Sequence, residues 1–133
     1  MTSVVIIADS GAEMARLTAH VHGAPGMTLV RHASGRVPVT GIVAEHAPAL
    51  VLLGEMSPRA LVLERLAEIR KASPASKVVV VAAEADARWL GIALAAGASA
   101  VIPGGPSSSA LGAVLRDVLD TDTGEPTALV QAA

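Results

Sequence analysis

Short runs of consecutive apolar residues, rich in β-branched side chains, constrain the fold of this chain most strongly. Their apolar residues do not alternate with polar ones, which is typical of strands buried on both faces of a parallel sheet. The runs are residues 4–8 (VVIIA), 27–30 (MTLV), 49–53 (ALVLL) and 78–82 (VVVVA), and a weaker run is 99–102 (SAVI). Such a sheet needs helices on both faces, because each face must be covered.

The segments between these runs have the apolar spacing of helices. Three stripes are present: Met14, Leu17 and Val21; Val62, Leu63, Leu66 and Ile69; Leu111, Val114, Leu115, Val118 and Leu119. Strands that alternate with helices imply right-handed crossovers and a doubly wound sheet. We therefore expect an α/β domain of the (βα)5 type over residues 1–120, with five parallel strands between two helical layers. Residues 121–133 carry no helical stripe and are predicted to be a tail or linker.

The composition excludes several classes of protein. Apolar residues make up 52% of the 133 residues and charged residues 17%, which excludes intrinsic disorder. A net charge of −2 and a single aromatic residue, Trp89, argue against direct nucleic-acid binding. Without cysteine, thiolate catalysis and zinc–thiolate sites are excluded. No apolar stretch approaches the roughly 18 residues of a membrane span, and the first residues lack a basic region, so we expect a cytoplasmic protein.

Functional residues should follow the strands, because ligands bind at the carboxyl ends of the strands in doubly wound sheets. The residues at these positions are few and mostly small: Asp9 and Ser10, Ala33 and Ser34, Gly54 and Glu55, Ala82 and Ala83, Gly104 and Gly105. These positions offer few groups that could catalyse a reaction: two carboxylates, two hydroxyls and otherwise small side chains. We therefore expect that the protein is not an enzyme.

Four segments of the sequence carry a family resemblance. IIADS is similar to a first strand that ends in two acidic residues, and ALVLLGEMSP to the strand and loop that hold a phosphoacceptor aspartate. VVVVAAEAD is similar to a strand that ends in Thr or Ser. AAGASAVIPGGPSSSALGAVLRDVL is similar to a strand that ends in Lys and the final helix. From about residue 4 to residue 119, the chain resembles the receiver domains of response regulators, especially the NarL/FixJ class. The resemblance implies a flavodoxin-like sheet with strand order 2-1-3-4-5.

Residue by residue, the resemblance implies that the groups of phosphoryl transfer are almost all missing. The first acidic position is Asp9, but the second is Ser10. The phosphoacceptor position is Gly54, the Thr or Ser position is Ala82, and the Lys position is Gly104. Glycine cannot form an acyl phosphate, and Asp9 alone offers Mg²⁺ only one carboxylate. We expect a vestigial phosphorylation pocket that uses no cofactor and holds no metal.

Glu55 directly follows Gly54 and brings a carboxylate close to the vacated position. Its side chain is one residue out of register, so it should point away from Asp9. We interpret Glu55 as a solvated loop residue. The alternatives are a displaced phosphoacceptor and a fixed mimic of the phosphorylated state.

The segment RWLGIALAAG offers a contact surface. Trp89 and Ile92, three residues apart, lie on or near the flank opposite the expected core stripe and have almost no charge around them. In receivers, this helix and the next strand form a common dimerisation and effector surface, and Val101 falls on the family's aromatic switch position. An exposed tryptophan beside isoleucine would anchor a partner. The alternative is that Trp89 folds over the sheet edge as a core residue. The expected core stripe consists of Leu90, Ala93, Leu94 and Gly97.

Two functional hypotheses follow. The first is a phosphorylation-independent pseudo-receiver that acts through a protein partner or a second copy of itself, as a homodimer, in signalling and transcription control. The alternative is a sensor in which the vacated phosphorylation pocket binds a small molecule. An exposed apolar patch at Trp89 and Ile92 would favour the first hypothesis, and an open apolar cavity over Gly54 would favour the second.

Overall fold

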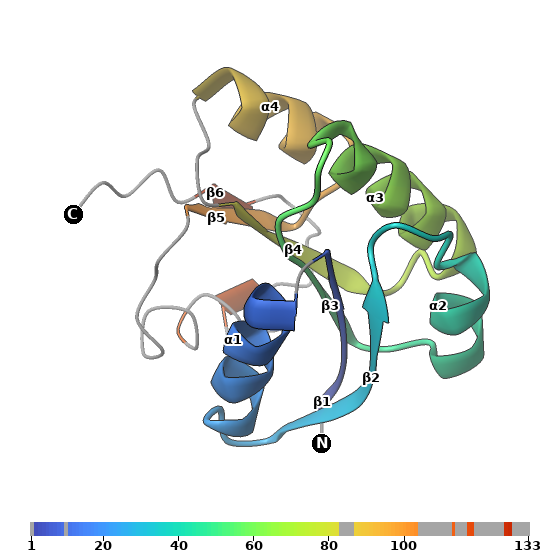
Figure 1. Cartoon of the computed structure of the whole chain (residues 1–133), viewed down its shortest axis with the longest axis vertical. Helices are drawn as coiled ribbons and strands as arrows, with labels where there is room; N and C mark the ends of the chain where they lie inside the picture. Colours follow the sequence, from blue (N-terminus) through green and yellow to red (C-terminus); the bar gives the residue numbers. More distant parts are fainter. Residues whose placement is uncertain are drawn as a thin grey trace.

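A central parallel sheet with helices on both faces forms the body of the protein (Figure 1). The structure is a computed structural model and describes residues 2–9, 11–82 and 87–103, together with 113, 117–118 and 127–128. The strands are β1 (Thr2–Ala8), β2 (Met27–Ser34), β3 (Leu50–Leu53), β4 (Lys77–Ala82), β5 (Ala100–Pro103) and β6 (Thr127–Ala128). Their order in the sheet is β2-β1-β3-β4-β5-β6, and every pairing is parallel. The predicted α/β class and the order of the first five strands are confirmed.

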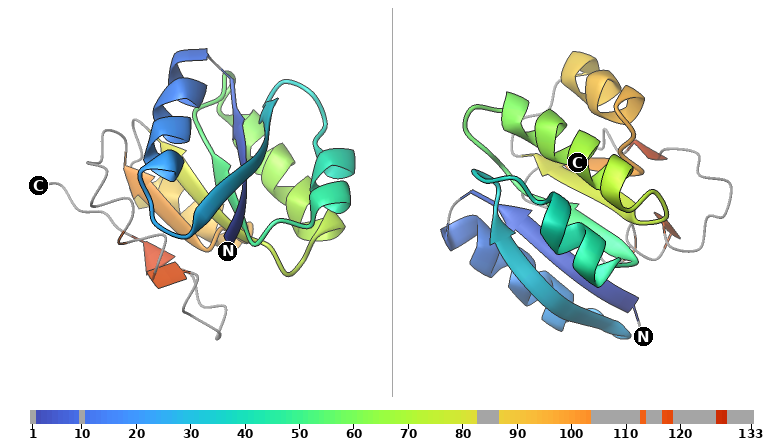
Figure 2. Two further views of the ribbon diagram at one scale, coloured as in Figure 1. Left: turned by 90° about the horizontal axis from the view of Figure 1, so that it is seen from below. Right: turned by 90° about the vertical axis from the view of Figure 1, so that its right-hand side faces the viewer.

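Described helices lie on both faces of the sheet. The helices are α1 (Gly11–His22), α2 (Thr40–His46), α3 (Ala60–Ala72) and α4 (Ala87–Ala95). Figures 1 and 2 show α1 on one face and α2, α3 and α4 on the other. Val118, from the predicted last helix, is helical and 3% exposed, and it packs in the core on the α1 side. Most of that predicted stripe lies outside the described residues. None of the described helices is long and apolar enough to cross a membrane.

The sheet divides the hydrophobic core into two halves. In β1, Val5 and Ile7 pack with α2, α3 and α4, whereas Val4 and Ile6 pack with α1. All four side chains are fully buried. Successive side chains of a strand point to opposite faces, so a strand covered on both faces must be apolar at every position. Each of these side chains contributes roughly 1.5–3 kcal/mol through burial. The consecutive apolar runs at β1, β3 and β4 are explained in this way.

The second strand departs from the prediction of burial on both faces. β2 lies at an edge of the sheet, and Val30 in it is 39% exposed. The pairing of β1 with β2 shifts between Leu29 and Arg31, so that Val30 is left without a partner in β1. A bulge of this kind bends an edge strand and interrupts its pairing. The apolar run at residues 27–30 therefore forms a strand, but one that is only partly covered.

The C-terminal segment, predicted to be a tail or linker, adds a sixth strand. Thr127 pairs with Ala100, and Ala128 pairs with Val101. Without this pairing, β5 would present a row of unpaired backbone N–H and C=O groups at the edge of the sheet. The strand has only two residues, which is too short to show the apolar pattern of a buried strand in the sequence.

Candidate functional site

Asp9 lies directly after β1, at the carboxyl edge of the sheet. Its side chain is only 11% exposed. Arg36 Nε donates a hydrogen bond to Asp9 Oδ1 at 2.5 Å, and Arg36 Nη2 lies 3.5 Å from Oδ2. The backbone N–H of Ser57 donates to the same Oδ2 at 3.2 Å. The hydrogen bond from Arg36 is the main reason that the pKa of Asp9 lies below its ordinary value, and the bond from Ser57 acts in the same direction. The Asp9 carboxylate is thus held in its charged form.

The loop that carries Arg36 is fastened to its surroundings. Arg65, a buried residue of α3, donates from Nε to the carbonyl of Gly35 at 2.9 Å and forms an ion pair with Glu68. Glu68 in turn accepts a hydrogen bond from a backbone N–H further along the same loop, at 2.8 Å. Gly35 packs so closely on Met56 that a Cβ atom there would lie 2.7 Å from the methionine sulfur. These contacts fix the loop next to Asp9, so that the exposed Arg36 reaches the carboxylate.

The space beside Gly54, the position that the resemblance assigns to the phosphoacceptor, is occupied. A Cβ atom at Gly54 would lie 2.9 Å from Cγ of Glu13, 3.1 Å from Cβ of Ala8 and 3.1 Å from Cδ1 of Leu17. Ala8 and Leu17 belong to the buried core, with 2% and 0% exposure. Any larger residue at position 54 would have to displace these atoms. There is therefore no empty space beside Gly54 on this side.

Glu13, in the first turn of α1, brings its own carboxylate to this place. Its side chain is 11% exposed. Oε2 accepts a hydrogen bond from the backbone N–H of Glu55 at 3.2 Å. Oε1 accepts from Arg16 Nε at 2.9 Å and from Arg16 Nη2 at 2.5 Å. The backbone of Glu55 also ties the loop to β1, because its carbonyl accepts from the Asp9 N–H at 3.3 Å. The Glu55 side chain is half-buried, rather than the solvated one predicted.

The carboxylates of Asp9 and Glu13 are thus each paired with an arginine. Within the described ranges, no group of three His, Asp or Glu side chains could hold a metal ion. Mg²⁺ prefers several oxygen ligands in near-octahedral geometry. At Asp9 and Glu13 the oxygens already accept hydrogen bonds from Arg36 and Arg16. The arrangement neutralises charge within the protein and has no vacant carboxylate pair for a cation.

Ala82, at the end of β4, faces the same region and is 3% exposed. A narrow hollow lies between Gly54, Glu55, Ala82 and Trp89, and it does not admit a water molecule. Between Gly54 and Ala82, the described part of the vestigial pocket is therefore closed, in contrast to the open cavity that the sensor hypothesis requires. Ser10 and Gly104 lie outside the described residues.

The predicted contact surface needs correction at two of its three residues. Trp89 is only 9% exposed and packs in the core with α3 and the strands, and the Arg59 guanidinium carbon lies 5.1 Å from its ring centroid. Val101 is fully buried in the same half of the core. The indole ring lies beside the narrow hollow that Gly54 and Ala82 also line. The prediction of an exposed Trp89 is wrong, and the alternative of a core residue is correct. Ile92 is 42% exposed, as its helical position predicted.

Glu13, Arg16 and Arg36 were not predicted as site residues. Glu13 follows Asp9 by four residues and begins a helix, which is a recognisable signal, and Arg16 is its i+3 neighbour. Arg36 lies 27 residues from Asp9, in a loop whose path depends on Arg65 and Gly35. Nothing in the sequence pattern marks that long-range pair.

Solved structures show where this architecture recurs. No protein-family model and no curated protein matches the sequence. A LuxR-family DNA-binding response regulator from Silicibacter pomeroyi is 22% identical with a TM-score of 0.76, over 100% of both chains. The signal receiver domain of the proposed response regulator NarL from Mycobacterium tuberculosis is 18% identical with a TM-score of 0.75, over 89% of this chain and 95% of that one. A proposed pilus assembly protein, CpaE, from Burkholderia thailandensis is 18% identical with a TM-score of 0.75, over 91% of this chain and 100% of that one. This chain has the fold of response-regulator receiver domains.

Proposed function

We propose that this chain is a pseudo-receiver, a signalling module that works without being phosphorylated and without catalysing a reaction. One observation carries the proposal: the acceptor position is Gly54, and the space beside it is filled by Glu13. An acyl phosphate requires a carboxylate at that position. The Glu13 carboxylate cannot easily replace it, because both of its oxygens accept hydrogen bonds, from Arg16 and from the Glu55 N–H.

A site of this kind carries a permanent charge pattern instead of a switchable one. In phosphorylation-dependent signalling, the added charge orders or releases neighbouring groups. Here the Asp9–Arg36 pair and the hydrogen bond from the Glu55 N–H to Glu13 hold the loops together without an added group. The module would therefore act by binding another molecule, and its signal would depend on whether the protein is present and bound rather than on its phosphorylation. We propose a protein partner, or a second copy in a homodimer, as what it binds.

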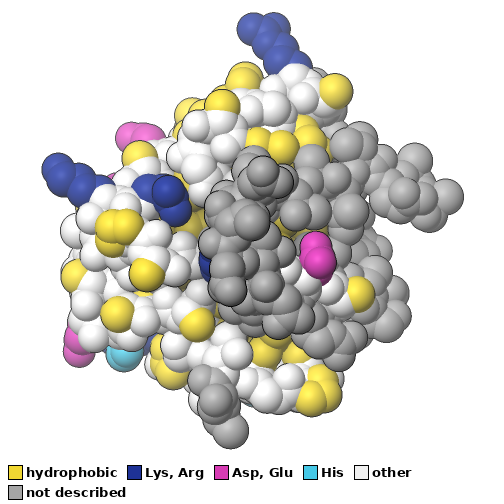
Figure 3. Space-filling view, turned by 180° about the vertical axis from the view of Figure 1, so that it is seen from behind, with side chains coloured by type: hydrophobic (Ala, Val, Ile, Leu, Met, Phe, Trp, Pro, Cys, Tyr) yellow, Lys and Arg dark blue, Asp and Glu magenta, His cyan; other side chains and the backbone are white. Residues whose placement is uncertain are grey.

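Transcription control in the cytoplasm is the setting that we propose. The similarity to LuxR-family DNA-binding response regulators supports this setting, and the similarity to a proposed pilus assembly protein offers another output for the same fold. DNA contact would belong to another domain or protein. In Figure 3, the few Lys and Arg side chains on the described part of this face do not form the extended basic stripe that is typical of nucleic-acid binding.

Phosphorylation chemistry provides the test. The protein is incubated with acetyl phosphate and Mg²⁺, and its intact mass is measured, with a phosphorylatable receiver domain in the same mixture as positive control. We expect no change in the mass of this protein. A stable increase by one phosphoryl group, removed in Glu13→Gln or in Asp9→Asn, would refute the proposal and identify the acceptor.

A further inference from the structure

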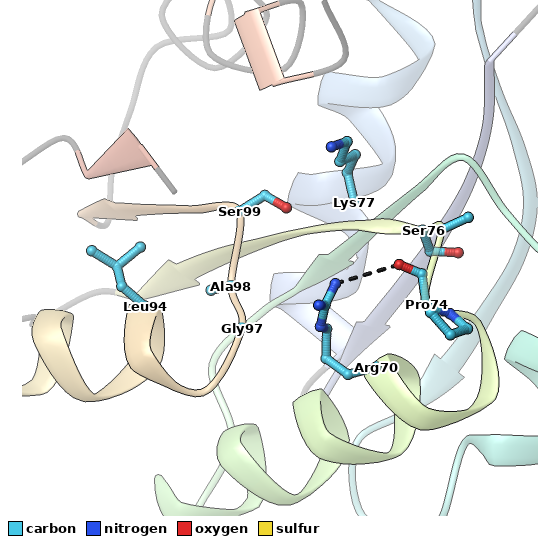
Figure 4. A pocket seen from close by; sticks show the side chains of 9 residues that line it. Arg70, Pro74, Ser76, Lys77, Leu94, Gly97, Ala98 and Ser99 are labelled. Carbon is cyan, nitrogen blue, oxygen red and sulfur yellow. Dashed lines mark hydrogen bonds between the residues drawn. The ribbon is translucent and has the colours of Figure 1, made fainter. Parts of the chain in front are cut away.

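A second cavity lies at the opposite end of the sheet from Asp9 and Gly54. It has a volume of about 310 Å³ and lies where α3 and α4 end and where β4 and β5 begin (Figure 4). Four of the described lining residues have polar side chains: Arg70, Ser76, Lys77 and Ser99. The volume is at the small end of the range for small-molecule sites. Because the cavity lies far from the vestigial pocket, its role does not depend on the fate of phosphorylation.

The side chain of Arg70 is placed by Gly97. A Cβ atom at Gly97 would lie 2.9 Å from Nε and 3.1 Å from Cδ of Arg70. Gly97 also has a φ of +113°, which favours glycine. The Nη1 atom of Arg70 lies 3.4 Å from the carbonyl oxygen of Pro74, which holds one end of the guanidinium group (Figure 4). A guanidinium has five N–H donors, so this single long hydrogen bond leaves most of its donor capacity for other acceptors.

Positive charge collects at this corner of the molecule. Arg70, Lys71 and Lys77 lie within one stretch of chain from the end of α3 to the start of β4. The ion pairs in the described part of the chain involve other cations, namely Arg16, Arg36 and Arg65. Among the described residues that line the cavity there is no Asp or Glu. An arginine without a carboxylate beside it in this part of the lining favours an anionic ligand.

The backbone at the cavity has little capacity left for binding. The N–H of Lys77 donates to the carbonyl of Ala49 at 3.0 Å, and the N–H of Ser99 donates to the carbonyl of Val78 at 2.7 Å. The Ser76 hydroxyl donates to the carbonyl of Pro48. The Ser99 hydroxyl accepts from the N–H of Val78 at 3.3 Å and still has a proton to donate. Recognition therefore falls to the side chains of Arg70 and Ser99.

We propose that this cavity binds a small molecule through an oxyanion group, a phosphate or a carboxylate. Arg70 makes the principal contact, since its planar donors match two oxygens of either group. Ser99 beside β5 adds a hydroxyl donor, whereas Figure 4 shows the Lys77 side chain on the other side of β4, pointing away from Arg70. The competing explanation is that Arg70 only caps the C-terminal carbonyls of α3, where cations are favoured. That explanation predicts no ligand binding.

The test is an amide NMR titration of the full chain with inorganic phosphate, and separately with acetate, at constant ionic strength against chloride. We expect saturable shifts at the amides of Gly97, Ala98 and Ser99, with dissociation constants of about a millimolar or below. Tighter binding of phosphate assigns a phosphate ligand, and tighter binding of acetate assigns a carboxylate ligand. Absence of saturable shifts with both anions would overturn the proposal.

Charge-matched variants separate a specific site from general attraction. Arg70→Gln should weaken binding by at least about tenfold, because it removes a charged donor pair. Lys71→Gln removes the same charge one residue away, outside the lining of the cavity, and should change affinity by no more than about twofold. An equal loss in both variants would overturn the proposal in favour of non-specific attraction. The thermal midpoints of both variants, measured without ligand, verify that each remains folded.

Discussion

The close packing at Gly54 predicts a measurable cost for adding a single methyl group there. The new Cβ atom of Gly54→Ala would lie 2.9 Å from Cγ of Glu13 and 3.1 Å from atoms of Ala8 and Leu17. Overpacking of this kind costs about 1–3 kcal/mol. The φ of Gly54 lies outside the left-handed region, so alanine gains about 0.4–1 kcal/mol by restricting the unfolded chain. We expect a net loss of about 1–2 kcal/mol.

Urea unfolding and thermal melting measure this loss. For a chain of 133 residues, it corresponds to a decrease in Tm of roughly 3–10 °C. Gly41→Ala is the matched control, because a Cβ atom at Gly41 would meet nothing within 4 Å. Gly41 lies in the exposed first turn of α2, where alanine should stabilise by about 0.5–1 kcal/mol. The two substitutions should therefore have opposite signs.

A double-mutant cycle identifies the cause. In a Glu13→Ala background, the shortest contact at position 54 is gone, so Gly54→Ala should cost less than about 1 kcal/mol. The remaining contacts, to Ala8 and Leu17, are both 3.1 Å and require smaller shifts. The reasoning fails if Gly54→Ala stabilises the protein as Gly41→Ala does. It also fails if the cost is the same with and without the Glu13 side chain.

Further predictions concern acid stability, self-association and the buried tryptophan. Because its pKa is lowered from 3.8 in the fold, Asp9 contributes stability above about pH 4 that is lost as the pH falls through the folded value. Arg36→Gln should therefore reduce the stability difference between pH 7 and pH 3 in urea unfolding, and an unchanged difference would contradict the role of this pair. Sedimentation should show weaker self-association for Ile92→Ser than for Val37→Ser, an equally mild change at an apolar residue that is 51% exposed; identical profiles would argue against a homodimer through α4. Trp89→Ala should lower the free energy of unfolding by about 3–5 kcal/mol, and a loss below about 1 kcal/mol would mean that the ring is not a core residue.

The parallel sheet could be predicted because burial on both faces makes a strand apolar at consecutive positions, whereas the strand order was predicted only from the resemblance to receiver domains. β1, β3 and β4 are apolar at almost every position, and the structure buries them accordingly. The edge position of β2 follows from the strand order that the resemblance implied, but the partial exposure of this strand was not predicted, because its apolar run was interpreted as burial on both faces. The pairing of Thr127 and Ala128 was missed for another reason: backbone hydrogen bonds formed by two residues require no particular side chains.

The site was less predictable because it depends on how side chains fill space. The absence of a carboxylate at Gly54 and of a hydroxyl at Ala82 could be read directly. The side chains that lie near these positions could not be predicted, because Glu13 and Trp89 come from the helices α1 and α4. A tryptophan three residues from an isoleucine looks exposed on a helical projection. A helical projection shows only the direction of a residue on its own helix. It does not show the packing with other elements, which buries the Trp89 ring beside Gly54 and Ala82.

The two carboxylate–arginine pairs at the carboxyl edge also affect the electrostatic field that an approaching molecule meets there. Asp9 with Arg36, and Glu13 with Arg16, each sum to zero charge over a few ångströms. Beyond about one Debye length, such pairs exert almost no field. These two pairs would therefore add little to the long-range electrostatic steering of a partner, even though each contains a full positive and a full negative charge.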